Sequence, residues 1–246
     1  MSHVWHTYCS RRRGSGGARS AIEFAVAARL FATEITLSCL IASAGTAACS
    51  AGELAVNVTD RLGHGVSGVV VTVTPADARG SKQAQTTAVM DQRALAFAPN
   101  VLVVATGTSV EFPNNDSVSH QVYSFSPAKK FQLPLYKGAR HPPVTFEHEG
   151  LVVLGCNIHD AMVGYIYVTD APYFGKTDVD GVLRLQNLKG GDYRVSLWSP
   201  FVADNSEALN HNVHVEDHDI TSSRVQLARA LRDQPEPRPR RKDWEY

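Results

Sequence analysis

Short stretches of alternating apolar and polar residues, separated by glycine and proline turns, run through most of this 246-residue chain. The first two, "ELAVNVTD" from Glu53 and "GVVVTVTP" ending at Pro75, are also rich in β-branched residues. Alternation with a period of two is typical of strands that bury one face. No amphipathic helical period occurs between residues 53 and 228, so the sequence predicts an all-β fold of the sandwich type.

The middle of the chain contains several such stretches in close succession. "ALAFAPNVLVVATGTSVEFPNND" predicts two or three strands, broken at Pro99, Gly107 and Pro113, and "SHQVYSFS" predicts another. "VTFEHEGLVVLGC" predicts a hairpin that turns at residues 148–150, and "VGYIYVTD" predicts the strand after it. We therefore expect residues 86–170 to form one set of closely spaced strands.

Residues 1–51 have the composition of an export leader. Three consecutive arginines precede the apolar stretch "ITLSCLIASAG", and the small residues of "TAACSAG" follow it. This order predicts a signal peptide cleaved after Ala48 or Ala51, and hence a periplasmic or secreted protein with no transmembrane segment in the mature chain. A lipid anchor on Cys49 and a cytosolic N-terminal extension are the alternatives. At the other end, residues 229–246 are charged and rich in proline, which predicts disorder.

Charge and cysteine content narrow the class of function. The chain has 24 Lys and Arg residues against 24 Asp and Glu residues, and this even balance gives no indication of a nucleic-acid partner. Three of the four cysteines lie within the predicted leader, so cleavage after Ala51 leaves Cys156 without a partner for an intramolecular disulfide. A lone thiol in an oxidising compartment is reactive unless it is occupied, and a bound metal would occupy it.

The stretch "GCNIHDAMVGY" places a thiol, an imidazole and a thioether at a spacing of three residues between two predicted strands. These side chains are Cys156, His159 and Met162. His120, which follows the polar turn in "NNDSVSHQV", is the candidate for a fourth ligand. Thiolate with two imidazoles and a weak axial thioether is the ligand set of blue-copper electron-transfer sites. The four residues therefore predict one mononuclear copper ion, with a zinc site or a decayed site as alternatives.

The segment "SHQV…GCNIHDAMVGYIYV" resembles the cupredoxins, the small blue-copper proteins of the plastocyanin and amicyanin type. "FPNNDSVSHQV" is similar to the part of that family that carries the first histidine ligand, and "VTFEHEGLVVLGC" is similar to the strands that lead into the cysteine. The whole chain is similar to exported proteins described as methylamine-utilisation or plastocyanin-like. The resemblance implies a Greek-key β-sandwich over residues 86–170, with type 1 copper held by His120, Cys156, His159 and Met162.

The strands on either side of this segment resemble a second family. "ELAVNVTDRLGHGVSGVVVTVTP" and "TDVDGVLRLQNLKGGDYRVSLW" are similar to two pieces of a carboxypeptidase-regulatory-like β-sandwich. The resemblance implies a second, smaller sandwich made of residues 52–80 and 171–228, with residues 86–170 inserted at an exposed turn. A single enlarged sandwich is the alternative.

These features favour a periplasmic one-electron carrier that is not an enzyme. Its partners would be redox proteins, such as a periplasmic dehydrogenase or a cytochrome. Copper storage or delivery is the second hypothesis, because it uses the same ligands in an exchangeable site. A structural or carbohydrate-binding export module is the third. Copper enzymes need additional histidine-rich copper sites, and the sequence offers no convincing second set.

Three further histidines lie near one another in "NHNVHVEDHDI", at His211, His214 and His218. On a strand, His214 and His218 would share one face, which leaves a second metal site as a hypothesis. A solvated strand face is the favoured interpretation. His141 and His148 lie in predicted loops and are expected at the surface.

Overall fold

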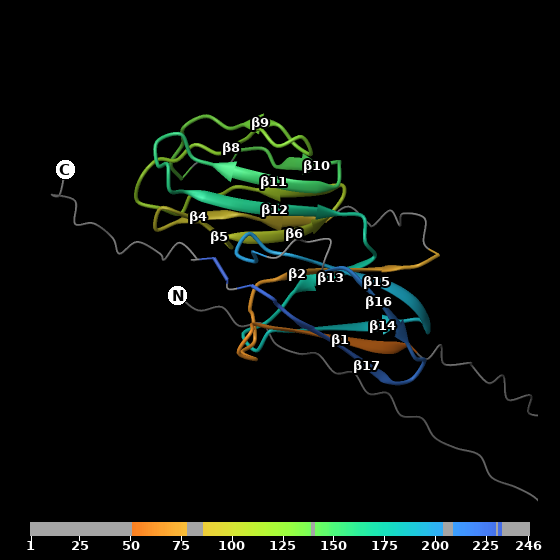
Figure 1. Ribbon diagram of the computed structural model, residues 1–246. Helices are drawn as coiled ribbons and strands as arrows, with labels where there is room; N and C mark the ends of the chain where they lie inside the picture. Colours follow the sequence, from red (N-terminus) through yellow and green to blue (C-terminus); the bar gives the residue numbers. More distant parts are fainter. Residues whose placement is uncertain (1–50, 78–85, 139–140, 204–208, 230, 233–246) are drawn as a thin grey trace, which may run out of the picture. The chain divides into compact units, whose positions relative to one another are not determined.

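The computed structural model describes residues 51–77, 86–138, 141–203, 209–229 and 231–232 (Figure 1). These residues contain seventeen β-strands and no α-helix, so the predicted all-β fold is confirmed. Within this part of the chain, no helix has the length and apolarity needed to cross a bilayer.

The predicted leader and tail fall almost entirely outside the described residues. Of residues 1–51 only Ala51 is described, and of residues 229–246 only Arg229, Leu231 and Arg232. Cleavage, lipid attachment at Cys49 and disorder of the tail therefore stay predictions.

One group of strands is formed by residues from both ends of the described chain. Strand β1 (Gly52–Thr59) pairs antiparallel with β14 (Val182–Leu188) and parallel with β17 (Ile220–Gln226). A second sheet has the order β13-β2-β15-β16. Its strands are β13 (Tyr173–Lys176), β2 (Val70–Pro75), β15 (Gly191–Trp198) and β16 (His211–Val215).

These two sheets share a hydrophobic core. Leu54, Val56 and Val58 alternate along β1, and each has 0% of its surface exposed. Valines and leucines of β2 and β15 belong to the same cluster of buried residues. Burial of one such side chain contributes about 1.5–3 kcal/mol, so the alternating pattern seen in the sequence is what holds the two sheets together.

The strands between β2 and β13 surround a separate core. A five-stranded sheet has the order β6-β12-β11-β8-β9, and a three-stranded sheet has the order β10-β7-β3, with β4 and β5 as an additional pair (Figure 1). Their bounds are β3 (Thr87–Val89), β4 (Asp91–Arg93), β5 (Ala96–Ala98), β6 (Val101–Ala105), β7 (Thr108–Glu111), β8 (Tyr123–Ser124), β9 (Phe131–Gln132), β10 (Val144–Phe146), β11 (Gly150–Gly155) and β12 (Val163–Thr169).

The predicted hairpin at residues 148–150 is wrong. Strand β10 pairs with β7, whereas β11 pairs with β12 and β8, so the two consecutive strands belong to different sheets. Phe146 of β10 and Val152 and Leu154 of β11 are all fully buried in the same core. The chain changes sheets here because both strands bury an apolar face in that core, and a flat hairpin would leave one of those faces exposed.

Candidate metal centre

The loop between β11 and β12 carries three of the predicted ligands. Cys156 follows β11 directly and is 3% exposed, and Met162, just before β12, is 1% exposed. A turn closes the loop, because the amide of Met162 donates to the carbonyl of His159 at 2.8 Å. The cysteine and methionine side chains are therefore fixed by the strand ends, and His159 lies at the turn between them.

Strand pairing brings His120 to this loop across 36 positions of sequence. Tyr123 of β8 pairs antiparallel with Gly155 at the end of β11. The residues before Tyr123 therefore lie opposite those after Gly155. His120 is held there by two backbone hydrogen bonds with Tyr136, each 2.9 Å long, and its side chain is 0% exposed.

The backbone bonds of His120 also make the predicted strand "SHQVYSFS" shorter than expected. Only Tyr123–Ser124 pairs as strand β8, because the backbone of His120 bonds to Tyr136 and that of Val122 accepts from Leu133. The residues before β8 thus form a bridged loop and not a continuous strand.

Three ligand atoms converge at this point. The Nδ1 atoms of His120 and His159 lie 3.1 Å apart, and the Sγ atom of Cys156 lies 3.8 Å from the first and 3.7 Å from the second. This is the one cluster of His, Cys, Asp and Glu side chains within the described ranges whose donor atoms all lie within 4.8 Å of one another. The structure thus brings together His120, Cys156 and His159 as the sequence analysis expected.

The two sides of the triangle that join sulfur to nitrogen have the length expected in a metal site. A metal bonded to imidazole nitrogen at about 2.0 Å and to thiolate sulfur at about 2.3 Å, with the donors spread around it in a plane, sets each S···N distance at roughly 3.7 Å. The two observed S···N distances, 3.7 and 3.8 Å, agree with that value. Two imidazoles and a thiolate are also borderline and soft donors, so the residues fit a copper ion or a zinc ion in both size and chemistry.

The environment of His159 favours metal binding. Burial lowers the pKa of His159, and the neighbouring His120 lowers it further, with Asp116 opposing both effects. A lowered pKa keeps the imidazole neutral at neutral pH, and neutral imidazole is the form that binds metals. His120 makes a 3.0 Å contact from Nε2 to the carboxylate of Asp116, which leaves Nδ1 facing Cys156 and His159.

Met162 lies at the same end of the sandwich. It belongs to the same buried cluster as Cys156, and its backbone amide is tied to His159 in the loop turn. Its role as an axial ligand stays a prediction, which its thioether and its position in the same loop as Cys156 and His159 support.

Sequence reasoning missed the polar residues behind His120. Asp116 contacts its Nε2 atom, and Asn114, which is 4% exposed, donates to the carbonyl of Tyr136. The signal was present in the segment "NNDSVSH", where a carboxylate precedes the histidine by four residues. That spacing brings two side chains together only when the loop folds back on itself, which the sequence pattern does not specify.

The other histidines have separate partners. His211 contacts Ser223 at 2.6 Å and His214 contacts Asp192 at 2.7 Å. The expectation that His214 and His218 share a strand face is wrong, because β16 ends at Val215 and His218 lies in the following turn with φ of 69°. The residues described here thus offer no second metal cluster in this region.

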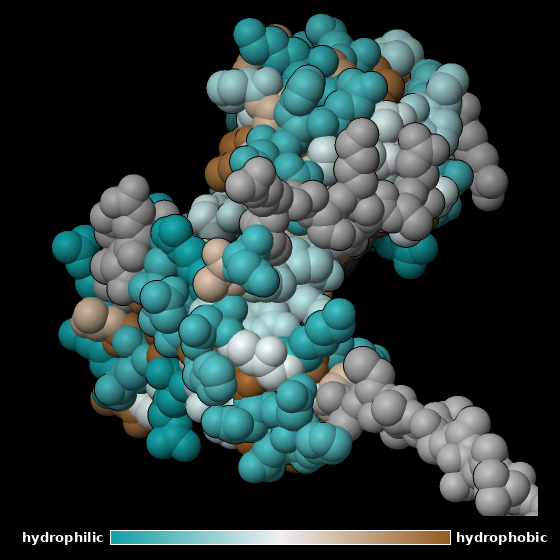
Figure 2. All heavy atoms as spheres, turned by 90° about the vertical axis from the view of Figure 1, so that its right-hand side faces the viewer, coloured by the Kyte–Doolittle hydropathy of each residue, from teal (hydrophilic) through white to brown (hydrophobic). Residues whose placement is uncertain are grey.

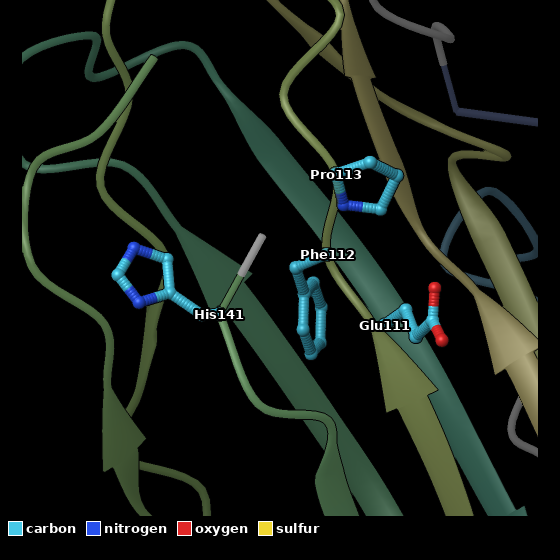
Figure 3. A pocket seen from close by; sticks show the side chains of 4 residues that line it. All are labelled: Glu111, Phe112, Pro113 and His141. Carbon is cyan, nitrogen blue, oxygen red and sulfur yellow. The ribbon is translucent and has the colours of Figure 1, made fainter. Parts of the chain in front are cut away.

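His141 lies in a loop as expected and is half-buried. Its ring packs edge-on against Tyr136 with centroids 4.4 Å apart, whereas His148 is exposed as expected. A small cavity of about 50 Å³ lies beside it, lined by Glu111, Phe112 and Pro113. Figure 3 shows the ring of Phe112 between the imidazole of His141 and the carboxylate of Glu111, so these two groups do not converge on a common ligand.

Comparison with known proteins gives weak matches. No family model and no curated protein matches the chain. A purple cupredoxin from Nitrosopumilus maritimus is 27% identical, with 33% of this chain and 96% of that chain covered and a TM-score of 0.29. A copper-containing nitrite reductase from Thermus scotoductus SA-01 is 26% identical, with 39% and 25% covered and a TM-score of 0.30. A reduced Cu(I) form of an amicyanin mutant is 20% identical, with 40% and 99% covered and a TM-score of 0.32. TM-scores of this size do not assign a family, so the case for a metal depends on the donor atoms of the chain itself.

Proposed function

We propose that this protein binds one copper ion through His120, Cys156, His159 and Met162 and transfers single electrons. The observation that carries the proposal is the triangle of two Nδ1 atoms and one Sγ atom, with sides of 3.1, 3.7 and 3.8 Å. Bound copper would supply a Cu(II)/Cu(I) couple, for which mixed thiolate, imidazole and thioether ligands are suited. The role requires no substrate chemistry, and we therefore propose a carrier and not an enzyme.

The proposed ligands differ in their exposure to solvent, and we propose separate roles for the buried and the exposed ones. His120 and Cys156 are buried, whereas His159 is partly exposed and its neighbour Ile158 is 51% exposed. The buried pair would keep water from the centre. His159 would provide the edge at which a redox partner approaches, with Ile158 as an apolar contact beside it.

We also propose that the protein works outside the cytoplasm, where a dehydrogenase or a cytochrome would exchange electrons with it. The leader composition and the single cysteine of the predicted mature chain support this location. A thiol held by a metal is protected from oxidation there.

Visible absorption of the purified protein with added Cu(II) tests the proposal. We expect one equivalent of Cu(II) to give an intense blue, violet or green band, which disappears on reduction and returns on oxidation. The Cys156→Ser variant is the matched control, because it keeps the size of the side chain but removes the sulfur. It should bind copper without the intense band.

Other outcomes would assign other functions. Colourless Cu(I) binding that a chelator removes within minutes would replace electron transfer with copper delivery. Selective retention of Zn(II) over copper would overturn the proposal. Full activity of the Cys156→Ser variant in the host pathway would indicate a structural or carbohydrate-binding role.

A further inference from the structure

A buried carboxylate stands directly behind one of the proposed ligands. The side chain of Asp116 is 7% exposed and that of His120 is 0% exposed, and their Oδ2 and Nε2 atoms lie 3.0 Å apart. The same Oδ2 accepts the amide of Leu95 at 2.7 Å, and Oδ1 accepts the amide of Ser117 at 2.6 Å. Asp116 thus has both oxygens hydrogen-bonded and one of them directed at the imidazole.

The loop holds Asp116 in this place through a second buried residue. Asn114 accepts the amide of Asp116 through Oδ1 at 3.0 Å. Its Nδ2 atom donates to the carbonyls of Val118 at 3.0 Å and Tyr136 at 2.8 Å. Tyr136 is in turn bridged to the backbone of His120. The carboxylate and the imidazole are therefore aligned by one connected network, as expected for a side chain that orients a ligand.

The contacts of this carboxylate place the hydrogen of His120. A carboxylate at neutral pH only accepts hydrogen bonds, and Oδ2 already accepts the amide of Leu95 at 2.7 Å. The 3.0 Å contact with Nε2 therefore requires the hydrogen to lie on Nε2 of His120. A neutral imidazole with hydrogen on Nε2 has its lone pair on Nδ1, the atom that faces Cys156 and His159.

We propose that Asp116 is a positioning residue of the metal centre, which fixes the tautomer of His120 and increases the electron donation from its Nδ1 atom. The proposal deepens the proposed function and depends on it only for the second of these two effects. A hydrogen bond from Nε2 to a carboxylate raises the basicity of a ligating histidine. A more basic ligand and a nearby negative charge both stabilise the more highly charged metal, so Asp116 lowers the reduction potential of the centre.

Two variants separate charge from hydrogen bonding. Asp116→Asn keeps the shape and an acceptor oxygen but removes the charge, and Asp116→Ala removes both. Asp160→Asn is the matched control, because it removes one carboxylate next to His159 from an exposed position. We expect Asp116→Asn to raise the reduction potential clearly more than Asp160→Asn does, and Asp116→Ala to weaken Cu(II) binding by about 10–100-fold.

Nitrogen NMR of the metal-free protein tests the tautomer without copper. At neutral pH we expect His120 to carry its hydrogen on Nε2 in the unaltered protein, and Asp116→Ala to give a mixture of tautomers. Hydrogen on Nδ1 in the unaltered protein, or equal potential shifts in Asp116→Asn and Asp160→Asn, would overturn the proposal. Failure to bind copper, with the Nε2 tautomer intact, would instead contradict the proposed function and leave the positioning of His120 established. If Asp116→Ala does not fold, Asp116→Asn still decides the charge effect.

Discussion

At the scale of single residues, Met162 would form the weakest of the four proposed bonds to copper, and its substitution would therefore adjust the redox couple most directly. Substitution of Met162 by leucine removes the sulfur and nearly conserves the volume, which costs less than about 1.5 kcal/mol in a core. The three strong donors are untouched, so copper and its intense colour should remain. Loss of a weak axial donor that favours Cu(II) should raise the reduction potential, which potentiometric titration followed by absorption measures.

The chain offers a matched control for this substitution. Met90 is also fully buried, in the same hydrophobic cluster as Met162. Met90→Leu should lower stability to a similar extent in urea unfolding and leave the potential unchanged. An equal change of potential in both variants would show that core packing, and not an axial thioether, sets the potential.

The convergence of Cys156 and His159 could be predicted from the sequence, whereas the hydrogen bonds that hold His120 could not. The spacing of Cys156, His159 and Met162 within one short loop identifies a soft-donor cluster from residue chemistry alone. His120 could be proposed because a polar turn precedes it. The contact of Asp116 with His120 depends on how a loop closes through Asn114, and this hydrogen-bond network leaves no periodic pattern in the sequence.

At the scale of strands, β12 makes a close contact with Phe97 just after the loop between β11 and β12. A Cβ atom added at Gly164 would lie 2.8 Å from Cβ and 2.8 Å from Cδ2 of Phe97. Phe97 is 2% exposed and its own Cβ cannot move without its backbone. Gly164→Ala should therefore destabilise the protein by about 1–3 kcal/mol, as overpacking of a core usually does. Urea unfolding measures this loss.

Gly175 on β13 gives the contrasting case. A Cβ atom there would meet Cδ1 of Leu183 at 2.7 Å, the far end of a flexible side chain. Leucine can change rotamer where a phenylalanine Cβ cannot, so Gly175→Ala should cost clearly less than Gly164→Ala. Equal losses of stability in the two variants would mean that strand conformation, and not the contact with Phe97, disfavours a side chain at residue 164.

Strand identity was easier to predict than strand partnership. The alternating stretches around Glu53 and Pro75 correspond to β1 and β2. They could be predicted because residues that alternate between buried and exposed faces of a strand alternate between apolar and polar in the sequence. The prediction of a hairpin at residues 148–150 was wrong. A short polar connection between two apolar strands can join neighbours in one sheet or lead from one sheet to another. The choice depends on which apolar faces meet across the core, and local sequence does not contain that information.

At the scale of the whole molecule, the predicted leader would determine where the protein obtains its metal and meets its partners. We predict that the protein isolated from its native host begins between Cys49 and Gly52, because the small residues of the predicted cleavage site end there. Intact-mass measurement of the extracellular or periplasmic fraction tests this start. A lipid anchor would add the mass of the acyl chains to a protein that begins at Cys49. Recovery of residues 1–40 on protein from the cytosol would contradict export.

The two hydrophobic cores predict how copper changes the stability of the chain. His120, Cys156 and His159 all come from the segment between β2 and β13. The core of that segment includes Cys156 and Met162. The core that β1, β2 and β15 share is built from other residues. Hydrophilic side chains dominate the molecular face in Figure 2, so the apolar residues of both cores are covered there. A ligand stabilises the unit that binds it by about 2.7 kcal/mol at 100 times its dissociation constant.

Calorimetry should therefore show two unfolding transitions, of which copper raises only one. For a unit of 60–100 residues, each kcal/mol raises the midpoint by about 4–8 °C, so the shift should be about 10–20 °C. In the Cys156→Ala variant that shift should largely disappear, while the second transition keeps its midpoint. A single transition would show that the two cores unfold together. An equal shift of two separate transitions would show that copper binding is not confined to one of the two units.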